Sequence, residues 1–214
     1  MSRPIPTWVV HFTRVEHLST IVARGLLSDT RAQGEGLLAV EVGNTQIKDR
    51  RSSRTVPVDP GGVVADYVPF YFAPRSPMMS SIHNGKVPTY QDGCGRLVYL
   101  VTTLEQLDSH ALDMVLTDRN AVLQLADFWN LANGEPEADF IDWPLMKARY
   151  WFSTDEYPDR RERRMAECLV HGAVPFEAFT SIVTMNQAVA DEAAEILRNA
   201  RSTIPVSVGR DWYF

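Results

Sequence analysis

Short apolar runs alternate with turn residues along the first part of the chain. Residues 8–13 hold strand-forming side chains directly after two prolines, which predicts a β-strand. From His17 to Ala23 the apolar residues fall at helical spacing and Gly25 follows as a stop signal, so this stretch predicts a short helix. Residues 67–72 predict a buried strand, and Pro69 indicates an edge or a bulge because proline has no N–H for the ladder.

The same alternation continues to the C-terminus. Further strands are predicted at 97–101, 165–170 and 181–185, with edge strands at 205–208 and 212–214. Further helices are predicted at 78–83, 104–107, 121–131 and 187–200. Strands and helices follow one another without a regular βαβ rhythm. The pattern therefore favours an α+β fold with an antiparallel or split sheet over a doubly wound parallel one.

Residues 28–65 interrupt this pattern with a long polar stretch rich in glycine and proline. We expect it to be a loop. Loops of this length are uncommon in compact domains, and binding loops or lids are the usual reason for them.

Composition places the chain among ordinary globular proteins. It has 214 residues, 45% hydrophobic and 22% charged, so we expect one domain over residues 1–214. No apolar run approaches the roughly 20 residues of a membrane span, and the N-terminus lacks a signal-peptide pattern. Cys94 and Cys168 form no CxxC pair, which favours a reduced, cytoplasmic protein.

The positive charge is unusual in kind. Net charge is −6, which argues against a globally basic nucleic-acid binder, yet all but three of the 21 basic residues are arginine. Two clusters stand out, at 48–54 and 160–164. Arginine presents a planar fork of donors that fits phosphate oxygens. The clusters are either two solvated faces or two local anion-binding walls.

Common catalytic signatures are absent, and one glutamate remains out of place. The chain has no phosphate-binding P-loop, no G-x-S-x-G elbow and no H-E-x-x-H pair. Its cysteines and histidines are too scattered for a zinc site, so no metal is expected. Glu167 lies inside the apolar run 165–170. It either faces solvent at a strand end or lines a pocket. In a pocket beside arginines, its carboxylate could stabilise an oxocarbenium-like sugar carbon.

His11 and Thr13 form a second candidate. In a strand over 8–13 both side chains point to the same face, because strand residues alternate between faces. They are either satisfied core groups or a polar pair that hydrogen-bonds a ligand's amide or ribose.

These features together resemble the DarT family of DNA ADP-ribosyltransferases, the toxins of toxin–antitoxin pairs, over nearly the whole chain. The matching blocks are 11–13 with the helix that ends at Gly25, 47–51, 60–62, 66–78 and 164–171. The long block 66–78 is the most specific, and the block that begins at residue 11 is weak alone.

The resemblance implies an ADP-ribosyltransferase-like split antiparallel β-core with flanking helices and long active-site loops. Such a fold clamps NAD, the co-substrate, and transfers its ADP-ribose to a base of single-stranded DNA, releasing nicotinamide. By motif match the catalytic residues would be Glu167 and Arg51, with Arg50 and Arg54 left open as alternatives to Arg51. The NAD contacts would come from His11, Thr13, Gly25, Arg51, Tyr71 and Met78.

The resemblance also implies substrate loops and partners. Residues 28–58 would fold over NAD, and about 118–166 would recognise the DNA. The DNA contacts would come from Arg75, Arg119, Arg149, Trp151, Arg160, Arg163 and Arg164. A macrodomain-containing antitoxin would be the protein partner, and no membrane is involved. Cys168 stands where an aromatic residue is expected, and the modified base, thymidine or guanosine, stays open.

Three other functions remain compatible with the sequence. A non-catalytic binder of single-stranded nucleic acid would use the arginines and aromatic residues but leaves Glu167 unexplained. A metal-dependent nuclease would use acids such as Asp139, Asp142 and Asp155. A closer relative would transfer ADP-ribose to RNA or protein instead of DNA.

Overall fold

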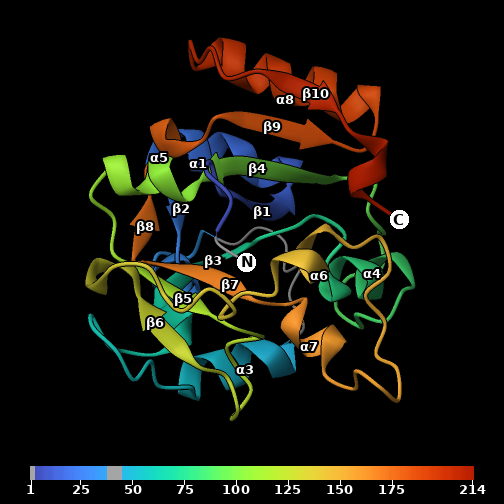
Figure 1. Ribbon diagram of the computed structural model, residues 1–214. Helices are drawn as coiled ribbons and strands as arrows, with labels where there is room; N and C mark the ends of the chain where they lie inside the picture. The colour runs from blue at the N-terminus through green and yellow to red at the C-terminus, as the bar shows by residue number, and fades with distance from the viewer. Residues whose placement is uncertain (1–2, 38–44) are drawn as a thin grey trace.

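An eight-stranded sheet runs through the centre of the computed structural model, which describes residues 3–37 and 45–214 (Figure 1). The strand order is β10-β9-β4-β1-β3-β7-β5-β6. All pairs are antiparallel except the edge pair of β9 and β10. The strands are β1 (Trp8–Arg14), β3 (Tyr67–Tyr71), β4 (Leu97–Thr103), β5 (Met114–Thr117), β6 (Phe128–Asn130), β7 (Glu167–His171), β9 (Ser181–Thr184) and β10 (Val206–Val208), and a separate pair joins β2 (Leu26–Leu27) to β8 (Ala173–Val174).

The sheet is split between β1 and β3. These neighbours share a single register pair, Val10 with Tyr71, whereas β3 pairs with β7 along its whole length. Pro69 lies opposite Leu169 of β7, and its carbonyl faces β1, where it bonds to the His11 ring. In an antiparallel strand the backbone nitrogen and carbonyl oxygen of one residue point to the same side. The Pro69 nitrogen therefore also faces the split, where no neighbouring strand requires an N–H donor. Pro69 therefore marks the edge of the split, not the edge of the sheet.

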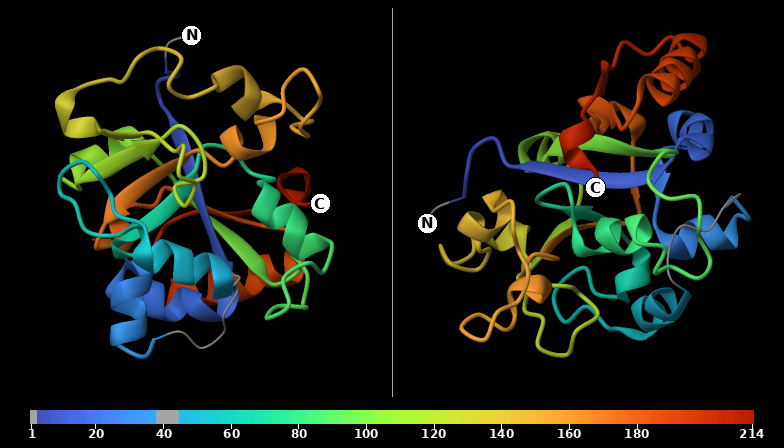
Figure 2. Two further views of the ribbon diagram at one scale, coloured as in Figure 1. Left: turned by 90° about the horizontal axis from the view of Figure 1, so that it is seen from below. Right: turned by 90° about the vertical axis from the view of Figure 1, so that its right-hand side faces the viewer.

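Helices cover both faces of this sheet, because alternate strand residues are apolar on both sides. Val9 belongs to a core cluster with α1, α5, α6 and α8, whereas its neighbour Val10 packs in a second cluster with α4. Figure 2 shows α8 at one end of the molecule and α3 at the other. The helices are α1 (Leu18–Arg24), α2 (Asp29–Gly34), α3 (Thr45–Ser53), α4 (Pro77–His83), α5 (Leu104–Ser109), α6 (Trp143–Lys147), α7 (Arg160–Arg163) and α8 (Gln187–Asn199), with 3₁₀ turns η1 (Val15–His17), η2 (Val64–Asp66), η3 (Leu131–Asn133), η4 (Phe176–Ala178) and η5 (Arg210–Trp212).

Several sequence predictions hold and several are wrong. The α+β class and the split sheet are confirmed, as are the central strands and the helices that contain α1, α4 and α8. The predicted helix 121–131 is wrong: Asp118 accepts the Asp127 amide at 2.9 Å, and this turn feeds β6 instead. The predicted edge strand 212–214 is a 3₁₀ turn and coil.

Two helices interrupt the expected long loop 28–65 among its described residues. It contains α2, which Ser28 caps at its N-terminus, and α3, which has no apolar stripe for a periodicity argument to find. Residues 38–44 of the expected NAD loop lie outside the described residues. Over the described ranges, no helix is long and apolar enough to cross a bilayer.

Candidate active site

Glu167 is the first residue of β7 and is buried, with 2% of its surface exposed. Its register neighbours are Tyr71 on β3 and Thr117 on β5. Its backbone N–H donates to the Thr117 hydroxyl at 3.1 Å. The solvent-facing alternative for this glutamate is therefore wrong, because the strand start is flanked on both sides by neighbouring strands.

The Glu167 carboxylate is held by two donors. Arg51 Nη1 donates to Oε1 at 3.0 Å and lies 3.4 Å from Oε2, and the Ala121 amide donates to Oε2 at 3.1 Å. Both side chains are nearly inaccessible, 9% for Arg51 and 3% for Glu167. A charge pair taken out of water needs good geometry and further hydrogen bonds to be tolerated, and this one has both.

Arg51 has a second amino group to offer. Its Nη2 atom is buried and has no hydrogen-bond partner among the described residues. A buried guanidinium donor without a partner is costly, and an anionic or hydroxyl-bearing ligand would satisfy it.

Arg50 and Arg54, the alternatives to Arg51, lie elsewhere. Arg50 is exposed on α3, one residue before Arg51, because successive helix residues point about a quarter turn apart. Arg54 places its guanidinium 5.5 Å from the centre of the Phe128 ring and bonds the Gln124 carbonyl at 3.5 Å. Over the residues that the structure describes, the arginine that pairs with Glu167 is Arg51.

His11, Thr13 and Gly25 line one cavity of about 140 Å³ beside the split in the sheet. The His11 Nδ1–H donates to the Pro69 carbonyl at 2.8 Å, which fixes the ring across the split. Burial lowers the pKa of His11, partly opposed by that hydrogen bond, and the nearby Arg51 charge adds to the lowering. His11 is therefore neutral. Pro69, which also lines this cavity, lies two residues before Tyr71 on β3, and Tyr71 is the register partner of Glu167, so the same strand connects the cavity with the carboxylate.

Gly25 is required at the end of α1 by both conformation and space. Its φ is +80°, and a Cβ there would stand 2.6 Å from the Val174 carbonyl oxygen. Any other residue would push β8 away from the end of α1, where Gly25 lines the cavity.

Tyr71 and Met78 meet on the other side of the carboxylate. The Tyr71 hydroxyl lies 3.8 Å from the Met78 sulfur, and the Tyr71 ring stacks on Phe12 with centroids 6.1 Å apart. Burial raises the pKa of Tyr71, and the Glu167 charge raises it further. Tyr71 is thus a neutral hydroxyl beside the carboxylate, on a rigid aromatic pair.

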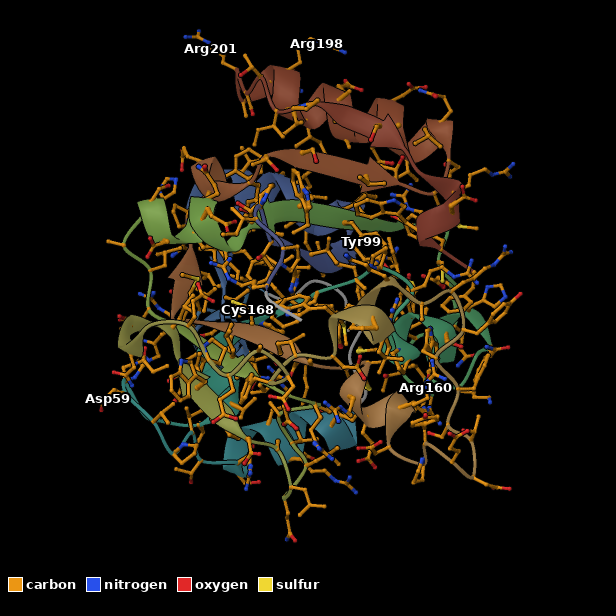
Figure 3. The ribbon with its side chains drawn as sticks, in the orientation of Figure 1. Asp59, Tyr99, Arg160, Cys168, Arg198 and Arg201 are labelled. Carbon is orange, nitrogen blue, oxygen red and sulfur yellow. The ribbon has the colours of Figure 1, made fainter. Side chains whose placement is uncertain are left out.

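Two predicted DNA contacts lie on the exposed segment 149–160. Arg149 is exposed and stacks over the Tyr150 ring at 5.8 Å. Arg160, labelled in Figure 3, lies 6.0 Å over the Tyr157 ring and donates to the Tyr150 carbonyl at 3.2 Å.

Two further predicted contacts, Arg119 and Arg75, are engaged within the protein, and a third, Arg163, lines a cavity. Arg119 bonds the Asp118 carboxylate at 2.8 Å, and Asp159 and Glu162 lie within 4 Å of it. Arg75 lies 4.4 Å over the Phe214 ring. The side chain of Arg163 lines a separate cavity of about 420 Å³ under β6, together with Asp118 and Trp129.

Trp151 and Arg164 are the two predicted DNA contacts that the structure contradicts. Trp151 is 3% exposed and packs in the main core cluster, so no base can stack on it; the accessible rings are Tyr150 and Phe152, at 69% and 60%. Arg164 is 5% exposed, and its guanidinium is occupied by backbone carbonyls. Neither side chain can reach a DNA strand.

The residues considered for metal binding stay apart. Among the described residues, no three His, Cys, Asp or Glu side chains come together as a cation site. Asp142 instead caps α6 by accepting the Leu145 amide. Cys168 faces the main core, and burial raises its pKa.

Sequence reasoning missed several groups at this site. The Ala121 amide and the Thr117 hydroxyl hold Glu167, and Phe12 supports Tyr71. His17 bonds the Thr13 hydroxyl at 3.0 Å, and Asp29 lines the cavity. A backbone amide leaves no trace in a sequence, but the run Met114–Thr117 has the β-branched character of a strand and could have been recognised.

Comparison with known proteins gives one consistent result. The profile of the family described as "ssDNA thymidine ADP-ribosyltransferase, DarT" matches residues 10–214. The chain is 34% identical over 214 residues to the DNA ADP-ribosyl transferase of Thermus sp. (strain 2.9), which covers 99% of this chain and 98% of that protein. It is similar to the structure of Thermus sp. 2.9 DarT in complex with ADP-ribosylated ssDNA, with a TM-score of 0.89, 33% identity, and coverage of 100% and 99%. The structure of that protein with NAD+ gives a TM-score of 0.83 at 32% identity, with full coverage of both chains.

Proposed function

The chain belongs to the DarT family and is an NAD-dependent DNA ADP-ribosyltransferase; we propose that its acceptor is a thymidine base in single-stranded DNA and that Glu167 and Arg51 are its catalytic pair. The thymidine assignment rests on the description of the family. The pair rests on one observation, a buried carboxylate bonded to a buried guanidinium at 3.0 Å.

The proposed reaction breaks one glycosidic bond and forms another. The bond between nicotinamide nitrogen and ribose carbon breaks, and its electrons leave with neutral nicotinamide. The ribose carbon becomes oxocarbenium-like, and the Glu167 carboxylate stabilises this positive charge. The base nitrogen then bonds to that carbon, and its proton passes to the Glu167 carboxylate, which makes Glu167 the general base.

Arg51 has two tasks in this proposal. Nη1 fixes the carboxylate, and the unpartnered Nη2 binds a phosphate or ribose oxygen of NAD. Because a guanidinium is planar and offers several donors, one side chain can perform both tasks.

We place the nicotinamide side of NAD in the cavity lined by His11, Thr13 and Gly25. The His11 ring is neutral and uses Nδ1 on Pro69, so Nε2 remains an acceptor for an amide N–H. Tyr71 and Met78 would line the place where the ribose meets the base. A single strand suits such a site because it presents a base without the cost of unpairing.

The wider biological setting is also a proposal. We expect residues 1–214 to act as one domain, because its sheet takes strands from residue 8 to residue 208. The resemblance to DarT toxins supports a toxin role opposed by a macrodomain-containing antitoxin. A DNA substrate and two unpaired cysteines are compatible with the cytoplasm.

Mass spectrometry of an oligonucleotide tests the proposed acceptor and the pair together. We expect the protein and NAD to add one ADP-ribose unit to a single-stranded oligonucleotide that contains thymidine, and fragmentation to place it on that base. Four oligonucleotides, each lacking a different one of the four bases, distinguish thymidine from guanosine as the acceptor, because only the strand without the acceptor base stays unmodified. E167Q is expected to remove the product, whereas E162Q, an exposed carboxylate variant on α7, keeps it. Transfer to a thymidine-free strand would overturn the assignment of the base, and full activity of E167Q would overturn that of the pair.

A further inference from the structure

Arg164 is a buried cation whose described contacts are all backbone carbonyls. It is 5% exposed, and among the described residues it forms no ion pair. Nη1 donates to the carbonyls of Leu145 and Met146 at 2.6 and 2.7 Å and to Ala148 at 3.3 Å. Burial lowers the pKa of Arg164 to about 10. A charge held in this way is expensive, so its geometry calls for a reason beyond packing.

The first group of carbonyls belongs to the end of α6. The last carbonyls of a helix lack the full set of partners within the helix, and a cation with several donors can satisfy them. At the end of α6 the Leu145 carbonyl also accepts from the Ala148 amide. Because Leu145, Met146 and Ala148 are all bonded to one guanidinium, the point where the chain leaves α6 is fixed.

The second contact of Arg164 is on a distant segment. Nη2 donates at 2.9 Å to the carbonyl of Pro74, in the corner between β3 and α4. Ser76 in the same corner caps α4, which carries Met78. Arg164 itself lies three residues before Glu167. One guanidinium thus joins the end of α6, the start of α4 and the approach to the catalytic strand.

The segment that leaves α6 carries the exposed aromatic rings. Tyr150, Phe152 and Tyr157 are 69%, 60% and 52% exposed, and Arg149 and Arg160 lie over two of these rings. Aromatic rings interleaved with arginines are suited to stacking bases and pairing phosphates of a single strand.

From these contacts we infer that Arg164 is a positioning residue for the DNA substrate: it holds the ring-bearing segment 149–157 in register with the Met78 corner and with Glu167. The inference rests on the proposed function, in which that segment meets DNA. Arg164 acts through the backbone, without touching either substrate. Its loss should therefore disturb DNA binding, while the cavity proposed for the nicotinamide side of NAD, whose lining contains no residue of 74–84 or of α6, keeps its shape.

Steady-state kinetics with both substrates tests this inference on the full chain. R164M removes the charge, and R164K retains it but cannot span four carbonyls in two segments. We expect R164M to raise the KM for a thymidine oligonucleotide on the order of tenfold, the scale of one lost stacked base, with the KM for NAD within about twofold. R164K should fall between R164M and wild type. R198M is the matched control, because Arg198 is exposed on α8, far from Arg160 and α7 (Figure 3).

If R164M does not fold, amide hydrogen exchange measured on R164K tests the inference instead. In R164K we expect faster amide exchange over 149–157 and 74–84, with α8 unchanged. Equal shifts of both KM values, an unchanged DNA KM in folded R164M, or uniform exchange in R164K would overturn the inference. Failure of wild type to modify the oligonucleotide would instead overturn the proposed function, so the two failures are distinguishable.

Discussion

The catalytic pair and the ring-bearing segment 149–157 are built in opposite ways. Glu167 and Arg51 are buried, and the carboxylate is bonded from a helix and from a backbone amide, on a strand with neighbours on both sides. The segment 149–157 contains no helix or strand, and three of its rings are exposed. A bond-breaking step needs groups fixed within a fraction of an ångström, whereas strand recognition needs accessible rings. Under the proposed function, the fold therefore separates the chemistry from the recognition of DNA, and Arg164 would connect the two.

Removing the catalytic carboxylate should produce the largest effect. E167A is expected to lower the transfer rate by roughly 10⁴-fold, since both charge stabilisation and proton acceptance are lost. It should also lower the free energy of unfolding by about 3–5 kcal/mol, because Arg51 is left as an unpaired buried charge. Transfer measured by oligonucleotide mass and stability measured by urea unfolding check the two effects separately.

The double variant E167A/R51M sharpens this result. Removing both charges should restore part of the lost stability without restoring transfer. If activity recovered along with stability, Glu167 would serve folding alone. The buried pair would then not be the chemical centre that we contrast with the segment 149–157.

The neighbouring residues Trp151 and Phe152 make a matched comparison within the recognition segment. W151A should lower the free energy of unfolding by about 3–5 kcal/mol, because Trp151 is a core residue. F152A should leave stability within about 0.5 kcal/mol, because the Phe152 ring is 60% exposed. Thermal or urea unfolding of the two variants gives the answer. Similar losses for both would mean that the segment packs against the protein instead of facing DNA.

These same two residues show what a sequence reveals and what it hides. The run Tyr150-Trp151-Phe152 is compatible by sequence with stacking on bases and with core packing, and only the folded structure decides which ring is inside. The resemblance to a known family identifies Glu167 and Arg51, whereas the apolar surroundings of Glu167 are compatible with a solvent-facing strand end as well as with a pocket. The Ala121 amide could not be predicted, because the turn that delivers it contradicts the helical spacing of 121–131. The strands β1, β3, β4, β7 and β9 follow from local side chains, whereas β5 was missed and β6 lies where a helix is predicted. The helix α3 has no apolar periodicity that a sequence could show.

Exposed rings should control DNA affinity. The double variant Y150A/F152A is expected to weaken binding of a single strand by about 1–3 kcal/mol for each base that loses its stacking partner. Fluorescence anisotropy of a labelled oligonucleotide measures the change, with NAD binding as the internal control. Unchanged DNA affinity would show that the DNA does not bind at the segment 149–157, and Arg164 would then have no role in DNA recognition.

The smallest effect should come from a charge network outside both regions. Glu16 bonds Arg14 at the end of β1 and Arg96 before β4, and Arg96 also bonds Glu192 of α8. Hydrogen bonding to Arg14, partly opposed by burial, lowers the pKa of Glu16 to about 2. A lowered carboxyl pKa contributes stability that is complete above its unfolded value near pH 4.5 and is lost as the pH falls towards 2.

E16Q should therefore flatten the loss of stability between pH 4.5 and 2. The expected size is about 1 kcal/mol, since the Glu16 side chain is 32% exposed and solvent screens its interaction with Arg14. E177Q, an exposed carboxylate outside the described ion pairs, is the control and should leave the pH profile unchanged. Transfer per folded molecule at pH 7 should stay the same in both variants, because the network lies apart from the Arg51–Glu167 pair. A fall in transfer for E16Q would show that the end of β1 is coupled to the NAD cavity, so that scaffold and chemistry are not independent.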